Sequence, residues 1–217
     1  MPDSFIPSER TRVVREPQRA VYDREVIYKI LDEAFVCHVG FTVESQPYVI
    51  PTMFARVGEA IYIHGSAASR MLRGLSNSLP VCVTVTLLDG LILSRSVFNH
   101  SMNYRSVVAL GHATLIDNPD EKLRVLQAFT EKLIHGRWND ARQPNERELK
   151  ATSILKLPLT EVSAKVRVGG VEDDAEDYAL PVWAGVIPLR LVADPAIRDP
   201  RCDASLPTPP YASEYKR

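Results

Sequence analysis

A strand-like apolar run leads directly into a turn of small and hydroxyl residues followed by arginines. The stretch is IYIHGSAASRMLR, from Ile61 to Arg73. We expect the turn to open a short helix over Ala67–Ser76, whose first backbone N–H groups attract an anion. Ser66 and Ser69 are small enough for close approach to a phosphate, and Arg70 can grip its oxygens in bidentate fashion. The pattern indicates a phosphate site; an ordinary strand-to-helix connection with solvated arginines is the alternative.

Other patterns of chemically active residues argue against hydrolases and metal sites. The five histidines lack metal-ligand spacing such as H-x-x-x-H, and no G-x-S-x-G turn is present. Cys37, Cys82 and Cys202 are widely spaced, which argues against a disulfide framework or a cysteine zinc site. Cys37 and Cys82 lie in strand-like runs, so we expect reduced core cysteines and a cytoplasmic protein. No metal is expected, and the catalytic residues are unknown from sequence.

The amino-acid composition limits the classes of protein to which this chain can belong. The chain has 217 residues, 45% of them apolar, and a formal net charge of −1. This charge predicts no general attraction to nucleic acid or anionic membranes, and no apolar run approaches the roughly 18 residues of a membrane span. The polar N-terminus lacks the apolar centre of a signal peptide. We expect an arm over residues 1–20, one folded domain over 21–192, and a proline-rich tail over 193–217.

The elements between arm and tail read mainly as sequential strands. Helix starts are indicated at Asp23 and at Asn118-Pro119, where the polar side chain caps the helix and proline suits its first position. Asp89-Gly90 predicts a hairpin turn, and Gly111 permits a bulge or tight bend in a long strand. We expect strands at Phe35–Thr42, Tyr48–Val57, Ala60–His64, Val81–Leu87, Leu91–Leu93, Tyr104–Ile116, Ser153–Leu157 and Val162–Val168.

The helices and loops around these strands complete the expected fold. We expect Val26, Ile27, Ile30 and Leu31 to form the buried face of the first helix, and Leu123, Leu126, Phe129, Leu133 and Ile134 that of the second. A shorter helix is expected over Asn145–Ala151, and the acidic run Glu172–Asp177 reads as a solvated loop. The fold class is mainly β (α+β): an antiparallel sheet closed into a small barrel with peripheral helices.

Four longer segments together resemble a known family. They are GFTVESQPYVIPTMFARVGEAIYIHGSAASRMLR, DGLILSRSVFNHSMNYRSVVALGHATLI, KATSILKLPLTEVSAKVRVGG and DYALPVWAGVIPL. In order and spacing they resemble split-barrel flavoproteins related to pyridoxamine 5′-phosphate oxidase, over about residues 10–190. The chain is most similar to the flavin-nucleotide-binding branch that includes the 5-nitroimidazole-resistance proteins. The resemblance implies an FMN-binding split β-barrel that forms a homodimer with FMN between the subunits.

The resemblance also implies where FMN would be bound. The ring and its polar edge would lie beside Tyr48, Val49, Ile50, Pro51 and Thr52. The ribityl chain and phosphate would meet His64, Gly65, Ser66, Ser69 and Arg70. Met71 stands where the family commonly has lysine, so one cationic phosphate contact is missing unless Arg73 replaces it. The other side of the flavin, or the other subunit, would contribute Asn103, Tyr104, Arg105, Ser106 and Trp183.

Several of these residues have a second interpretation. Arg105 or Lys165 could stabilise a reduced, anionic flavin, or Arg105 could pair with acidic residues. His64 could contact the phosphate or pack over the barrel end as a turn histidine. His100 could be an acid or a substrate contact, or a loop histidine without a catalytic role. Trp183 could anchor a dimer interface instead of walling the cofactor.

The function that follows is an FMN-dependent oxidoreductase with an unidentified small-molecule electron donor and acceptor. A true pyridoxamine phosphate oxidase is disfavoured, because its late Arg-Leu-His pattern reads Arg190-Leu191-Val192 here. The alternative from another class is a non-catalytic module that stores flavin, senses redox state, or binds haem or a deazaflavin. A structural dimer with a decayed site is a third possibility.

Overall fold

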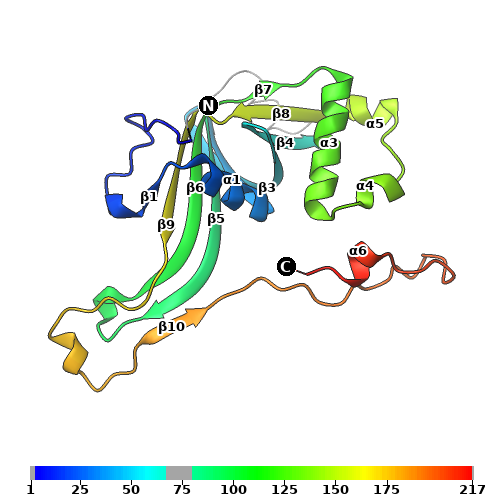
Figure 1. Ribbon diagram of the computed structural model, residues 1–217. Helices are drawn as coiled ribbons and strands as arrows, with labels where there is room; N and C mark the ends of the chain where they lie inside the picture. Colours follow the sequence, from blue (N-terminus) through cyan, green and yellow to red (C-terminus); the bar gives the residue numbers. More distant parts are fainter. Residues whose placement is uncertain (1–2, 67–79, 217) are drawn as a thin grey trace.

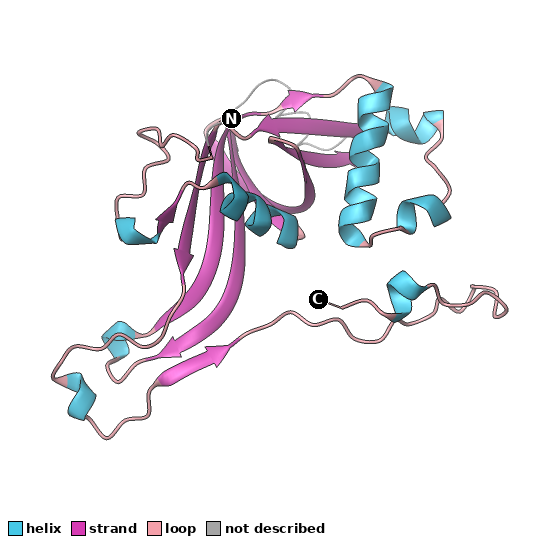
Figure 2. Cartoon of the chain, viewed as in Figure 1, coloured by secondary structure: helices cyan, strands magenta, loops and turns pink. Residues whose placement is uncertain are grey.

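The computed structural model describes residues 3–66 and 80–216, which form one antiparallel sheet with helices packed outside it (Figure 1, Figure 2). The pairing order is β1-β9-β6-β5-β2-β3-β4-β8-β7, with β10 beside β5. The sheet curls so that β6 also contacts β8. The predicted antiparallel split β-barrel with peripheral helices is confirmed.

The elements have the following bounds. The strands are β1 (Ala20–Val21), β2 (Val36–Val43), β3 (Gln46–Val57), β4 (Ala60–Ser66), β5 (Pro80–Leu93), β6 (Ser101–His112), β7 (Thr114–Leu115), β8 (Thr152–Pro158), β9 (Glu161–Arg167) and β10 (Gly185–Pro188). The helices are α1 (Arg24–Glu33), α3 (Pro119–Leu133), α4 (Arg137–Asp140), α5 (Glu146–Ala151) and α6 (Pro210–Ser213), with 3₁₀ turns η1 (Pro17–Arg19), η2 (Val97–Asn99) and η3 (Asp177–Ala179). No helix in this part of the chain has the length and apolar character needed to cross a bilayer.

The barrel core is built from alternate residues of the strands, with α1 packed against it. The Asp23 carboxylate accepts a hydrogen bond from the Val26 N–H at 2.9 Å, which confirms the predicted helix start. Val26 itself is 37% exposed and does not join the core face expected for it. The fully buried core residues include Ile27, Ile30, Leu31, Val39, Phe54, Ile61, Val83 and Leu157.

Strand β5 corrects the predicted hairpin at Asp89-Gly90. β5 runs without a reversal beside β6, with only a bulge between Leu88 and Gly90. β10 pairs with its far end, Gly90–Leu93. A tight hairpin of the expected kind needs positive φ at its central residues, and Gly90 does not have it. The prediction of a separate strand at Leu91–Leu93 is therefore wrong. These residues continue β5, because β6 and β10 on its two sides keep the chain extended.

Strand β6 also differs from its prediction. It begins at Ser101 and ends at His112, after which the chain moves over to pair β7 with β8. Gly111 is not at the bulge. A Cβ at Gly111 would lie 2.9 Å from Cδ1 of the buried Leu157, so any larger residue there would force the Leu157 side chain to move within the barrel core.

A second layer packs on the outside of the barrel, between α3 and strands β3, β4 and β8. Asn118 caps α3 by accepting from the Glu121 N–H at 2.9 Å, as predicted. Leu133 is 48% exposed, so the predicted α3 face is only partly core, because the helix end passes beyond the sheet. The buried residues of this outer layer are Ala55, Ala60, Tyr62, Ile116, Val125, Phe129 and Ile154.

The two chain ends behave differently. Residues 3–21 pack on the barrel: Phe5 is 3% exposed, and Arg10 forms an ion pair with Glu161 of β9. After β10 the chain continues without regular structure from the β5–β6 arm toward α3 and α4 until it reaches α6 (Figure 1). There Tyr211 accepts a hydrogen bond from Arg137 and donates one to Asp140, both of α4.

Candidate functional site

The first part of the candidate site is an open sheet edge on β3. β3 pairs with β2 from Gln46 to Met53, but pairs with β4 only from Phe54 to Val57. Its second edge over the Tyr48–Met53 half therefore carries no partner strand among the described residues. Pro51 lies in this half, where the lost N–H is tolerated. A planar ligand with polar edges can take the place of a neighbouring strand here.

The side chains of this β3 segment alternate between two faces. Tyr48 and Ile50 pack on the barrel core, and Tyr48 stacks on Phe41 with ring centroids 5.5 Å apart. Val49 and Pro51 face outward, and Val49 is 68% exposed. Thr52 is half-buried. Of the predicted run Tyr48–Thr52, only Val49 and Pro51 present exposed side chains; the others can contribute backbone groups.

The second part is His64, near the end of β4. Its ring stands edge-on to Phe129 of α3, with centroids 4.2 Å apart and an interplanar angle of 72°. Its Nδ1 atom is buried and has no hydrogen-bond partner among the residues that the structure describes. An unsatisfied buried polar atom costs about 1–3 kcal/mol, so it calls for an explanation. Burial also lowers the pKa of His64, which keeps the imidazole neutral and weakens the predicted role as an electrostatic phosphate contact.

A cavity of about 510 Å³ lies beside His64, between the sheet and the α3–α5 helices. Its walls come from four parts of the chain: Met53 of β3, Phe129 of α3, Trp138 of α4, and Arg142 in the loop before α5. The volume is within the roughly 300–1,000 Å³ of small-molecule sites.

Hydrogen bonds fix the helical wall of this cavity. Glu131 accepts from the backbone N–H groups of Gly136 and Trp138, at 2.9 and 3.2 Å, which sets the start of α4. Arg142 donates to both oxygens of Glu148, at 2.7 and 3.0 Å, and lowers the pKa of Glu148 to about 2. The cavity is therefore held by the local chemistry of α4 and α5.

The remaining phosphate-site residues of the prediction are not described. Gly65 pairs with Ser153 and Ser66 with Thr152 of β8, which places their backbones at the end of β4. Ser69, Arg70, Met71, Arg73 and the expected helix over Ala67–Ser76 lie outside the described residues. Their phosphate contacts stay predictions.

The other predicted contact residues lie on β6, which β5 and β2 separate from β3 in the sheet. Ser106 Oγ donates to the Lys165 carbonyl, and Tyr104 pairs with Arg167 of β9. Arg105 is bound bidentately by Asp89 at 2.8 and 2.9 Å and by Glu33 at 2.5 and 2.8 Å. These two carboxylates neutralise its charge and raise its pKa; the two contacts to Glu33 hold α1 against the sheet, and the two to Asp89 link β6 to β5.

A cation that the sequence analysis missed lies next to this segment. Arg167 is 6% exposed, and it donates to Asn103 Oδ1 at 3.0 Å and to the Gly170 carbonyl at 3.5 Å. Within residues 3–66 and 80–216 it forms no ion pair with a carboxylate. Lys165, which the sequence singled out, instead donates to the Arg15 carbonyl. The alternation of β9 directs Val162, Ala164 and Val166 to the core and Arg167 to the opposite face, so its burial could not be read from the strand pattern and depends on the following loop.

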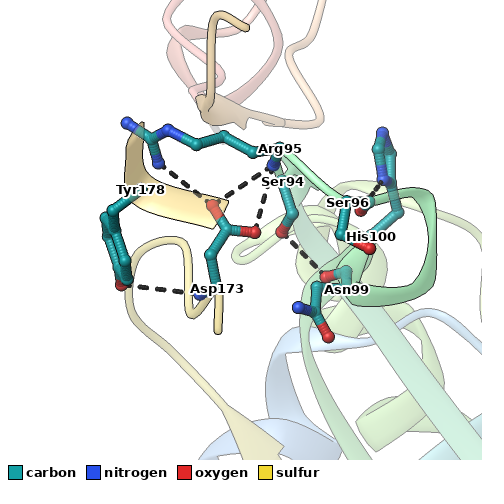
Figure 3. A network of polar contacts seen from close by, with 7 residues as sticks. All are labelled: Ser94, Arg95, Ser96, Asn99, His100, Asp173 and Tyr178. Atoms are coloured by element: carbon teal, nitrogen blue, oxygen red, sulfur yellow. Dashed lines mark hydrogen bonds and ion pairs between the residues drawn. The ribbon is translucent and has the colours of Figure 1, made fainter. Parts of the chain in front are cut away.

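A polar cluster fixes the far end of the β5–β6 arm (Figure 3). The Asp173 side chain is fully buried and accepts from the Arg95 backbone N–H and guanidinium. Tyr178 Oη accepts from the Asp173 N–H, and the Arg95 guanidinium lies 5.1 Å from its ring centroid. The acidic run is thus not wholly solvated. His100 Nδ1 lies 2.9 Å from the Ser96 carbonyl.

Two strongly exposed apolar side chains and an exposed tryptophan lie next to this cluster at the end of the arm. Val97 and Phe98 are 88% and 90% exposed. Trp183 is 69% exposed and lies on Gly185, where a Cβ would be 2.8 Å from the indole ring. The sheet of one chain does not bring Trp183 and Asn103–Ser106 beside the β3 edge: the arm curves away from the barrel (Figure 1).

Comparison with known proteins places this architecture in a family. The chain belongs to the pyridoxamine 5′-phosphate oxidase family, whose model matches residues 23–166. The resemblance expected from the sequence is thereby confirmed. Among curated protein sequences, none matches the chain significantly.

Two solved structures are similar over nearly their whole length. The flavocytochrome Anf3 from Azotobacter vinelandii is 42% identical with a TM-score of 0.92, covering 97% of this chain and 98% of that one. An FAD and haem binding protein from Mycobacterium smegmatis is 34% identical with a TM-score of 0.87, covering 91% and 97%. A protein assigned to 5-nitroimidazole antibiotic resistance from Bacteroides thetaiotaomicron is 25% identical with a TM-score of 0.56, covering 68% and 86%.

Proposed function

We propose that the protein is a flavin-binding redox protein that also carries haem. The observation that carries this proposal is the likeness, over more than nine tenths of each chain, to a flavocytochrome and to an FAD and haem binding protein. Their names favour FAD over the FMN expected from the sequence, and they favour the alternative of a flavin- and haem-binding module over an oxidoreductase that uses flavin alone. A bound flavin can accept two electrons together and pass them on one at a time.

The described residues suit a flavin in three respects. The open β3 edge offers backbone groups and the outward side chains of Val49 and Pro51 to a planar ring. β4 ends at Ser66, shortly before Ser69 and Arg70 in the sequence, which are predicted to contact the phosphate. Arg167, buried without a carboxylate partner in the described part of the chain, offers a positive charge to an anionic cofactor group. We assign to Arg167 the role that the sequence gave to Arg105 or Lys165.

We further propose that the protein is a homodimer whose β5–β6 arm meets the cofactor site of the partner. The arm carries exposed apolar side chains on several elements: Leu88, Leu91, Val97, Phe98, Met102, Trp183 and Ile187. Exposed apolar patches of this kind mark contact surfaces. A second copy would supply Asn103–Ser106 and Trp183 to the β3 edge. Light scattering of the purified protein tests this: a monomer with a full cofactor complement contradicts it.

The first experiment is the absorbance spectrum of the purified protein, with each released chromophore identified by mass. FAD together with haem supports the proposal. A colourless protein that takes up neither added FAD nor added haem contradicts it.

The second candidate function is a flavin-dependent oxidoreductase without haem, in which small-molecule substrates donate and accept the electrons. The family match over residues 23–166 favours it. Flavin alone in the spectrum, with rapid bleaching by a nicotinamide donor and reoxidation by a nitro compound or oxygen, would select this function. A cytoplasmic location is proposed for either function.

A further inference from the structure

The cavity beside His64 has a chemistry that the flavin site does not use. Its lining residues Met53, Leu126 and Phe129 belong to the outer layer and not to the barrel core. Figure 1 shows α3, α4 and α5, which supply most of the other lining residues, together on one side of the barrel. Its lining is mostly apolar, with Phe129, Leu126 and Leu133 from α3 and Trp138 from α4. A flat, largely apolar cofactor can lie against these side chains.

His64 is the one imidazole that lines this cavity, and it is prepared to act as a ligand. Its ring is held edge-on by Phe129, and within residues 3–66 and 80–216 its buried Nδ1 has no hydrogen-bond partner.

Met53 lies on the same face of the sheet and also lines the cavity. The register pairs Phe54 with Ile63, so the next pair along the two strands would be Met53 and His64. One imidazole and one thioether are axial ligands found on haem iron.

The cavity does not suit a bare metal ion. In the part of the chain that the structure describes, no three His, Cys, Asp or Glu side chains cluster in a way that could hold one. A zinc site needs about four protein or water ligands. Haem brings four equatorial nitrogens of its own and needs from the protein one axial ligand and apolar walls. Arg142 lines the same cavity but is paired with Glu148, so the proposal does not rely on its charge.

We propose that the cavity between the sheet and α3–α5 is the haem site, and that His64 is an axial ligand of the haem iron. This inference rests on the proposed function, because it assigns a place to the haem of that proposal. The open β3 edge remains available to the flavin, since Val49 and Pro51 lie on the same face farther along the strand.

The test compares haem and flavin content in the full chain and in single variants. Haem is measured by the pyridine haemochrome and by the Soret band, and flavin by its release and mass. His64→Ala should lose at least about tenfold in haem occupancy while keeping flavin, since even supporting residues of metal sites cost 10–100-fold. His112→Ala is the matched control, because His112 is an exposed imidazole at the end of β6 and does not line the cavity. It should keep the haem of the unaltered protein.

Two further variants separate ligation from folding. His64→Gly supplied with free imidazole should regain a six- or five-coordinate haem spectrum, which a merely structural role would not produce. Leu126→Trp keeps His64 but fills the cavity, and should exclude haem while the thermal transition stays cooperative. An unchanged Soret band in His64→Ala, or full haem in Leu126→Trp, would overturn the site.

The outcomes also distinguish this inference from the proposed function. If haem is retained in His64→Ala and lost in the variant His100→Ala, the iron ligand lies on the arm, and the proposed flavin–haem function still stands. Unaltered protein that holds flavin but takes up no haem would overturn both the haem site and the haem half of the function. If an adenine nucleotide competes with haem for the cavity, the cavity binds the adenosine part of FAD, and the haem site is overturned.

Discussion

Arg167→Met is the substitution that best separates cofactor binding from stability. In the structure the Arg167 guanidinium is buried, with one good hydrogen bond, to Asn103 Oδ1, and one long contact to the Gly170 carbonyl. A hydrogen bond to a charged group contributes about 1.5–3 kcal/mol, and a 3.5 Å contact adds little. Desolvating one ion costs several kcal/mol. These terms nearly cancel, so the uncharged methionine should leave the unfolding free energy of the apoprotein unchanged or raise it by up to about 2 kcal/mol.

Flavin binding, in contrast to stability, should become weaker in Arg167→Met. If Arg167 faces an anionic group of the flavin, its loss removes a charge-assisted contact of about 1.5–3 kcal/mol, which weakens binding roughly 10- to 150-fold. Urea unfolding of apoprotein measures the first quantity. Quenching of flavin fluorescence on titration with apoprotein measures the second.

Arg105→Met provides the contrast. It removes the cation that both Asp89 and Glu33 bind, so it should destabilise the protein by about 1–2 kcal/mol, between the values for exposed and buried pairs. A loss above about 3 kcal/mol in Arg167→Met would show that its charge is already compensated in the apoprotein. Unchanged flavin affinity in that variant would show that Arg167 does not face the cofactor. Either result would refute the reasoning.

Three further predictions follow from local contacts. Gly111→Ala places a methyl group 2.9 Å from Leu157 Cδ1 and should destabilise by about 1–3 kcal/mol in thermal unfolding; a neutral effect would mean that the barrel relaxes there. Burial raises the pKa of Cys37 to about 12, so iodoacetamide at pH 8 should label the exposed Cys202 and spare Cys37 in native protein, as read by mass spectrometry. The pKa of Glu148 is lowered to about 2, so its contribution to stability is present above its ordinary pKa of 4.5 and is lost as pH falls toward 2; Glu148→Gln should flatten the stability–pH curve in that window.

The chain's local signals were enough to predict most elements. Asp23 and Asn118 cap α1 and α3 as predicted, because a capping side chain satisfies N–H groups only two or three residues away. Strands β2, β3 and β4 begin and end within about two residues of their predicted bounds, because alternation and β-branched content are themselves local. The order of these elements with the four motif segments was sufficient to predict the split barrel and the family.

Other features depend on residues far apart in sequence, and only the tertiary structure decides them. Asp89-Gly90 reads as a hairpin turn, yet β6 and β10 on its two sides keep it extended. Arg105 reads as a flavin contact, yet Glu33, from a helix 72 residues earlier in the chain, helps neutralise it. Arg167 reads as an ordinary strand cation, yet the fold buries it.

His64 shows both contributions in one residue. The sequence alone placed it at the end of a strand beside a small-residue turn. Its neutral, unpartnered state and the cavity in front of it arise only when α3 brings Phe129 against β4 and the α4–α5 loop closes the outer wall. Sequence patterns record what a residue needs from its near neighbours, whereas burial and charge balance are set by packing between elements that the chain brings together only on folding.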